Sequence, residues 1–119
     1  MLMEEKIVKG WAALSRVELD RLFRSYRRYN ATRGTHRSAN APLGIDDSIV
    51  FLESLKVKET IMSLEDPLER ALLYNYYIAG LTLEKSGDRV GVSLRSATRI
   101  KKSALENILR RMKEMQGRA

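Results

Sequence analysis

The chain contains no cysteine and only one histidine, His36, among its 119 residues. Without cysteine it can form no disulfide and offers no thiolate to a metal ion. A single histidine also excludes a zinc site built on a histidine pair, and in its polar surroundings His36 is most simply solvated. We therefore expect no metal and no cofactor.

Long apolar runs are missing as well. A membrane-spanning helix needs about 20 consecutive apolar residues, and no run in this sequence approaches that length. The first residues, MLMEEKIVKG, place two glutamates where a secretion signal carries positive charge. These features predict a cytoplasmic protein with no membrane partner.

Recognisable catalytic motifs are the third absence. No carboxylate pair, no nucleophile next to a base and no phosphate-binding loop of the GxxxxGK[ST] type rises above chance. The sequence therefore favours a binding protein over an enzyme.

Positive charge is what the sequence has in excess. It holds 22 Lys and Arg against 15 Asp and Glu, a net charge of +7, which suits a polyanionic partner. Residues 21–38 contain six arginines and no acid, residues 46–66 carry a net charge of −4, and residues 95–118 carry +6. Two basic blocks that flank an acidic one predict separate surfaces, with DNA at the basic ones.

Helical periodicity covers most of the chain, prolines number only two, and strand signals are scarce. We predict an all-α protein with a long N-terminal helix over residues 4–29 and a loop over residues 30–45. The domains expected are an N-terminal helix with a basic linker, 1–45, and a helix-turn-helix DNA-binding domain, 46–119. The apolar residues of the first helix share one broad face: Ile7, Val8, Trp11, Ala12, Leu14, Leu19, Leu22, Phe23 and Tyr26.

That face is too broad to stay exposed. It must pack on the C-terminal part or on another copy of the chain, and we expect some self-association. Further along, a second helix is predicted to start at Asp46, and a third at Pro67 with Asp66 as its N-cap, ending at Gly80.

Residues 80–109, GLTLEKSGDRVGVSLRSATRIKKSALENIL, show the spacing of a helix-turn-helix. Thr82 can cap a short helix, and Gly87 is small enough for two helices to approach closely. Gly91 suits a tight turn, and Ser93 can cap a long basic helix. The buried stripe expected in that last helix is Ala97, Ile100, Ala104, Leu105, Ile108, Leu109 and Met112.

A recognition helix reads bases from its N-terminal residues in the major groove of double-stranded DNA. Arg95 and Arg99 lie one turn apart, and each can pair with guanine O6 and N7. Lys101 and Lys102 suit phosphate contacts. The whole set of expected DNA contacts is Arg89, Leu94, Arg95, Ser96, Thr98, Arg99, Lys101 and Lys102.

A second basic patch is expected in the arginine-rich stretch. It comprises Arg24, Arg27, Arg28, Arg33 and Arg37. This stretch can be an arm that grips phosphates or enters a minor groove, an RNA-binding segment, or the polar side of a packed helix.

From Leu64 onward the sequence resembles the fourth conserved region of sigma-70-type factors. The features are LEDPLERALLYNYYIAGLT, a short helix, GVS, and a helix ending in SALENIL. The wider plan resembles small phage transcription activators of the RinA and ArpU type. The resemblance implies a sigma region 4-like fold and a phage-type late-gene activator that contacts RNA polymerase. The chain departs from the family pattern at Ser86 and Gly87, where Ile-Ala is frequent, and at Arg95, where glutamate is frequent.

Three functions remain open from the sequence. The first is a sequence-specific, double-stranded DNA-binding transcription regulator. The second is an antitermination-like modifier that binds RNA polymerase. The third is a small terminase-like adaptor for DNA packaging.

Overall fold

The computed structural model describes residues 3–32 and 45–117, with side chains described over 6–27 and 51–116. Over these residues the chain is helical and has no β-strand, which confirms the all-α prediction for the described part. The elements are α1 (Met3–Ala12), α2 (Arg16–Thr32), α3 (Ile45–Met62), α4 (Pro67–Leu73), the π-helical turn η1 (Tyr74–Ile78), α5 (Leu83–Val90) and α6 (Leu94–Gly117).

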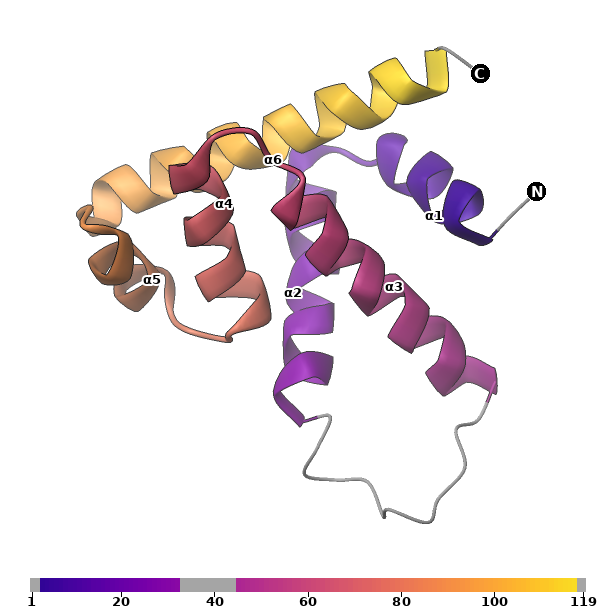
Figure 1. Ribbon diagram of the computed structural model, residues 1–119, viewed down its shortest axis with the longest axis horizontal. Coiled ribbons are helices and arrows are strands. Elements are labelled where there is room, and N and C mark those ends of the chain that lie inside the picture. The colour runs from indigo at the N-terminus through magenta and orange to yellow at the C-terminus, as the bar shows by residue number, and fades with distance from the viewer. Residues whose placement is uncertain (1–2, 33–44, 118–119) are drawn as a thin grey trace.

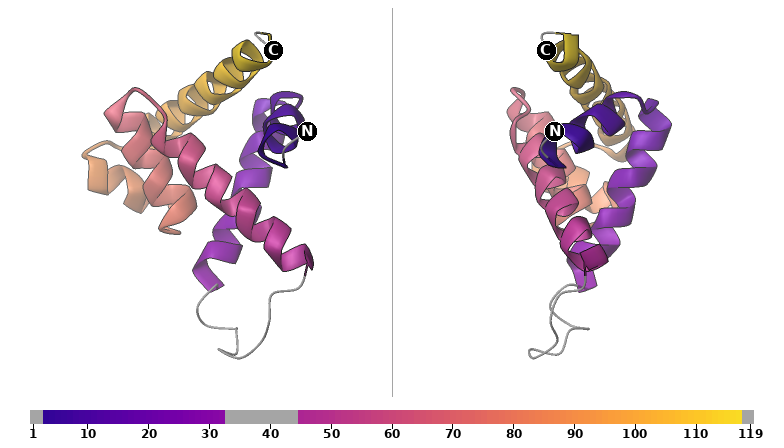
Figure 2. Two further views of the ribbon diagram at one scale, coloured as in Figure 1. Left: turned by 45° about the vertical axis from the view of Figure 1, so that its right-hand side comes forward. Right: turned by 90° about the vertical axis from the view of Figure 1, so that its right-hand side faces the viewer.

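The longest helix, α6, runs along one edge of the molecule (Figure 1). Helices α4 and α5 pack against its N-terminal half, and α1 lies beside its C-terminal half (Figures 1 and 2). Helices α2 and α3 cross between the α4–α5 pair and α1, and α2 also contacts η1. The N-terminal helices therefore pack onto the C-terminal ones.

The predicted single helix over residues 4–29 is wrong, because the chain breaks between α1 and α2. Ser15 Oγ accepts a hydrogen bond from the Glu18 amide at 3.2 Å, and the Ser15 amide donates to Glu18 Oε1 at 3.4 Å. This reciprocal pair is a capping box, which starts a new helix. The break turns α2 away from α1, so that both can present apolar side chains to one core.

One continuous core joins the two halves of the chain. The rings of Trp11 and Phe23 meet edge to face with centroids 5.2 Å apart, and those of Phe23 and Tyr77 do so at 5.5 Å. Leu105 of α6 is buried in the same cluster. The broad N-terminal apolar face thus packs on the C-terminal part of the same chain, which is the first of the two arrangements expected for it. Self-association and a domain boundary after residue 45 stay predictions.

Local signals set the helix ends in the C-terminal half as predicted. Asp66 Oδ1 accepts from the Leu68 amide at 2.8 Å, and Pro67 takes the first helical position of α4. After η1 the chain reverses at Gly80, whose φ of +78° lies in the left-handed region that favours glycine. Thr82 Oγ1 then accepts from the Lys85 amide at 3.1 Å, which fixes the start of α5.

Candidate nucleic-acid interface

A tight turn joins α5 to α6. Gly91 has a φ of +79°, and its amide donates to the Asp88 carbonyl at 3.2 Å. The Val92 amide donates to the Gly87 carbonyl at 2.9 Å. Ser93 Oγ accepts from the Ser96 amide at 3.2 Å and thereby caps α6. The turn therefore pairs the Gly87 and Asp88 carbonyls of α5 and the Ser96 amide near the start of α6.

Helices α5 and α6 approach closely at Gly87. A Cβ atom at this position would lie 2.9 Å from the Val92 carbonyl oxygen and 3.2 Å from the Ala97 Cβ. The preceding residue, Ser86, is fully buried, and its hydroxyl donates to the Thr82 carbonyl at 2.8 Å. The small side chains at 86 and 87, which depart from the sigma pattern, therefore allow α5 to pack tightly against α6.

The buried stripe of α6 decides which of its residues face outward. Ile100 is half-buried, and the other predicted stripe residues are buried. They anchor the helix on α4, α5, α1 and α2. The buried members are Ala97, Ala104, Leu105, Ile108, Leu109 and Met112.

The opposite side of the first three turns of α6 carries unpaired positive charge. Arg95, Arg99 and Lys102 are exposed, and so is Arg89 in the last turn of α5. Within the described part of the chain, none of these four side chains has an ion pair or a hydrogen bond. We call this surface the α6 cationic face: Arg89, Arg95, Arg99 and Lys102. Arg95, Arg99 and Lys102 share one side of α6 by their spacing, and Arg89 lies at the end of the preceding helix.

Three uncharged residues of the predicted site lie along the same turns. Leu94 and Thr98 are exposed, and Ser96 is half-buried. The Thr98 hydroxyl donates to the Leu94 carbonyl at 2.9 Å, and the Ser96 hydroxyl accepts from the Ser93 hydroxyl at 3.2 Å. Hydroxyl groups that we expected to contact DNA are thus partly engaged within the helix.

Lys101 does not lie as predicted. Its Nζ is 3.3 Å from Asp20 Oδ1 and 5.1 Å from the centroid of the Tyr76 ring, and its side chain is 17% exposed. The expected phosphate contact is corrected to an internal ion pair between α6 and α2. The cause is the helical period, which turns residue 101 toward α2 while residues 99 and 102 face outward.

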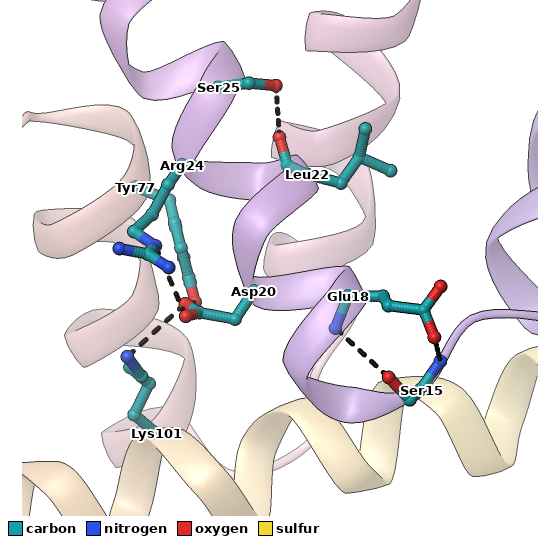
Figure 3. A network of polar contacts seen from close by, with 8 residues as sticks. All are labelled: Ser15, Glu18, Asp20, Leu22, Arg24, Ser25, Tyr77 and Lys101. Atoms are coloured by element: carbon teal, nitrogen blue, oxygen red, sulfur yellow. Dashed lines mark hydrogen bonds and ion pairs between the residues drawn. The ribbon is translucent and has the colours of Figure 1, made fainter.

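Asp20 is the centre of a polar network that the sequence did not reveal (Figure 3). Its carboxylate accepts a hydrogen bond from the Tyr77 hydroxyl, and its Oδ2 lies 3.3 Å from Arg24 Nε. Burial raises the pKa of Tyr77, and the hydrogen bond to Asp20 and the charge of that carboxylate raise it further. Only the spacing of four residues between Asp20 and Arg24 was visible in the sequence, whereas Tyr77 and Lys101 are distant along the chain.

The second basic patch is only partly described. The Arg27 guanidinium donates to the carbonyls of Gly80 at 3.0 Å and Leu81 at 2.9 Å, and its Cζ lies 4.7 Å from the Tyr76 ring centroid. Arg27 therefore fixes the turn before α5 and is not available as a phosphate-gripping arm. Arg24 is exposed and paired with Asp20. The Arg28 side chain, Arg33 and Arg37 lie outside the described residues, so their role stays a prediction.

None of the helices in the described ranges is long and apolar enough to cross a membrane. No protein-family model, curated protein sequence or solved structure matches this chain. The resemblance to sigma region 4 therefore stays an expectation from the quoted motifs.

Proposed function

We propose that this protein is a sequence-specific, double-stranded DNA-binding regulator of transcription, in which α5, the turn and α6 act as a helix-turn-helix. The α6 cationic face carries the proposal. Three of its four cations lie on the first turns of α6, whose start is fixed by a serine cap and a buried stripe, and Arg89 lies in the last turn of α5. None of the four has an internal partner in the described structure. A rigid helix that presents unpaired cations matches what a major groove admits and attracts.

The face divides into two kinds of contact. Arg95 and Arg99 lie four residues apart and project on one side of the helix near its N-terminus, where recognition helices read bases. A bidentate arginine contact to guanine discriminates by about 1–3 kcal/mol. Arg89 and Lys102 flank them and suit backbone phosphates, which position a protein on DNA without reading its sequence.

The resemblance to phage activators suggests RNA polymerase as the protein partner. In this proposal the protein binds near a late promoter and recruits RNA polymerase, as the sigma-like motifs of residues 64–109 imply. The wider plan resembles small phage activators, so we propose that the protein acts as an activator.

Selection from a random DNA library at two salt concentrations tests the proposal. We expect one enriched motif, with an affinity that falls steeply as salt rises. In the selected duplex, Arg95→Ala and Arg99→Ala should each reduce affinity about tenfold to a hundredfold and relax specificity at one base pair. Arg110→Ala is the matched control, because Arg110 is exposed on the C-terminal half of the same helix.

Two results would contradict this function. An unenriched library would exclude sequence-specific binding. An equal loss of affinity for all sequences in the Arg95 and Arg99 variants would show that these arginines contact only phosphate.

One observation favours a second candidate, an RNA polymerase-binding modifier. Helix α3 exposes three apolar side chains, Leu52, Leu55 and Met62, in a segment, residues 46–66, that carries a net charge of −4. Exposed apolar patches are typical of protein contacts. Capture of purified polymerase by this protein in the absence of any DNA affinity, lost in a Leu52→Ser/Leu55→Ser variant, would favour the modifier over the DNA-binding regulator.

A further inference from the structure

An apolar ridge runs beside the arginines of the α6 cationic face. Leu94 is the first residue of α6 and is 49% exposed, although it lies on the side of the helix that carries the buried stripe further along. Thr98 follows one turn later and is exposed too. Because the Thr98 hydroxyl already donates to the Leu94 carbonyl at 2.9 Å, its donor is used within the helix. The groups that residues 94 and 98 still offer are mainly hydrocarbon.

A single exposed leucine needs no explanation. Two exposed hydrocarbon groups one turn apart, on a helix start that otherwise carries unpaired cations, form a more specific pattern. Neither group contributes to the core, and neither can donate a hydrogen bond to a phosphate. In the major groove, however, one base alone presents an apolar group, the C5-methyl of thymine.

We propose that Leu94 and Thr98 read thymine methyl groups, next to the guanines that Arg95 and Arg99 read. This inference rests on the proposed function and names the class of DNA site. Residues four apart on a helix are about 6 Å apart along its axis, close to two base-pair steps of about 3.4 Å each. The site therefore contains thymine and guanine within the same three or four base pairs.

The chemistry also distinguishes the two kinds of reading. An arginine on guanine depends on hydrogen-bond acceptors and on charge, so its contribution falls with salt. The contact between a thymine methyl group and leucine removes apolar surface from water and involves no charge. The thymine contribution should therefore be nearly independent of salt, whereas the overall affinity is not.

Replacement of thymine by deoxyuridine tests the inference, because it removes the methyl group and leaves the hydrogen-bonding edge unchanged. In the selected duplex, each thymine is replaced in turn and the affinity is measured at two salt concentrations. At one or two positions we expect a loss of about fourfold per methyl, the equivalent of one buried methylene. The loss should be the same at both salt concentrations.

Protein variants assign each methyl to its residue. Leu94→Ala should bind the thymine and deoxyuridine duplexes equally at one position, and Thr98→Ser, which keeps the hydroxyl, at a second. Met115→Ala is the control, because Met115 is a similarly exposed apolar residue near the other end of α6. It should keep the full preference for thymine.

The outcomes separate this inference from the proposed function. If every deoxyuridine duplex binds as well as the parent while Arg99→Ala still loses affinity, the inference is overturned and the regulator stands. A thymine preference that persists in both the Leu94 and Thr98 variants also overturns it. If no duplex is enriched at all, the proposed function fails, and the inference fails with it.

Discussion

Gly87 offers the sharpest test of how α5 and α6 fit together. Alanine at this position adds a Cβ that would lie 2.9 Å from the Val92 carbonyl oxygen, a backbone atom in the turn. A contact this short requires a shift, and the turn cannot give way as a flexible side chain can. Overpacking of this kind costs about 1–3 kcal/mol, whereas the exchange of a helical glycine for alanine returns about 1 kcal/mol.

The difference predicts that Gly87→Ala lowers the free energy of unfolding by up to about 2 kcal/mol. Urea unfolding followed by circular dichroism at 222 nm measures it. The matched control is Gly10→Ala in α1, where no atom lies within 4 Å of the added Cβ. Because only the helix preference changes there, Gly10→Ala should stabilise the protein by up to about 1 kcal/mol.

A third glycine separates backbone strain from crowding. Gly91→Ala meets no atom within 4 Å, but its φ of +79° strains any side chain by about 1–2 kcal/mol. If Gly87→Ala stabilises the protein as Gly10→Ala does, the close approach of α5 and α6 is wrong. If Gly91→Ala leaves the free energy of unfolding unchanged while Gly87→Ala lowers it, the left-handed conformation of Gly91 is wrong instead.

Three further substitutions test the contacts of α2. Asp20→Asn leaves Lys101 without its carboxylate, and a loss of about 1–3 kcal/mol of unfolding free energy is expected; an unchanged urea midpoint would refute the network. Ser15→Ala should cost about 1 kcal/mol through the lost cap of α2, and equal stability would place the helix start elsewhere. The pKa of Tyr77 is raised in the folded protein, so its contribution is present below the unfolded-state pKa of about 10 and is lost as pH rises above it. Stability measured from pH 8 to pH 11.5 should therefore fall less steeply in Tyr77→Phe than in the wild type, and parallel curves would contradict this.

Much of the C-terminal half could be predicted because its signals are local. The side chains of Asp66, Thr82 and Ser93 each accept a hydrogen bond from an amide no more than three residues away. Gly91 is required by the left-handed φ of its own backbone. The apolar stripe of α6 then places Arg95 and Arg99 outward by helical geometry alone. These features need no knowledge of the rest of the fold.

Contacts between distant segments could not be predicted. Apolar periodicity continues across the break at residue 15 and therefore favours one long helix. The capping box Ser15-Arg16-Val17-Glu18 is a local signal that the prediction did not use. Lys101 and Arg27 have the same chemistry as the exposed cations. Their internal roles depend on Asp20, Tyr76 and the turn at residues 80 and 81, which only the folded chain brings near.

An NMR titration with the selected duplex tests the central claim most directly. With amide resonances assigned, the account predicts that the largest shifts on addition of DNA occur between Arg89 and Lys102. Residues of α3 should shift little. Large shifts on α2 or α3, with the start of α6 unchanged, would contradict the assignment of the α6 cationic face as the surface that binds DNA.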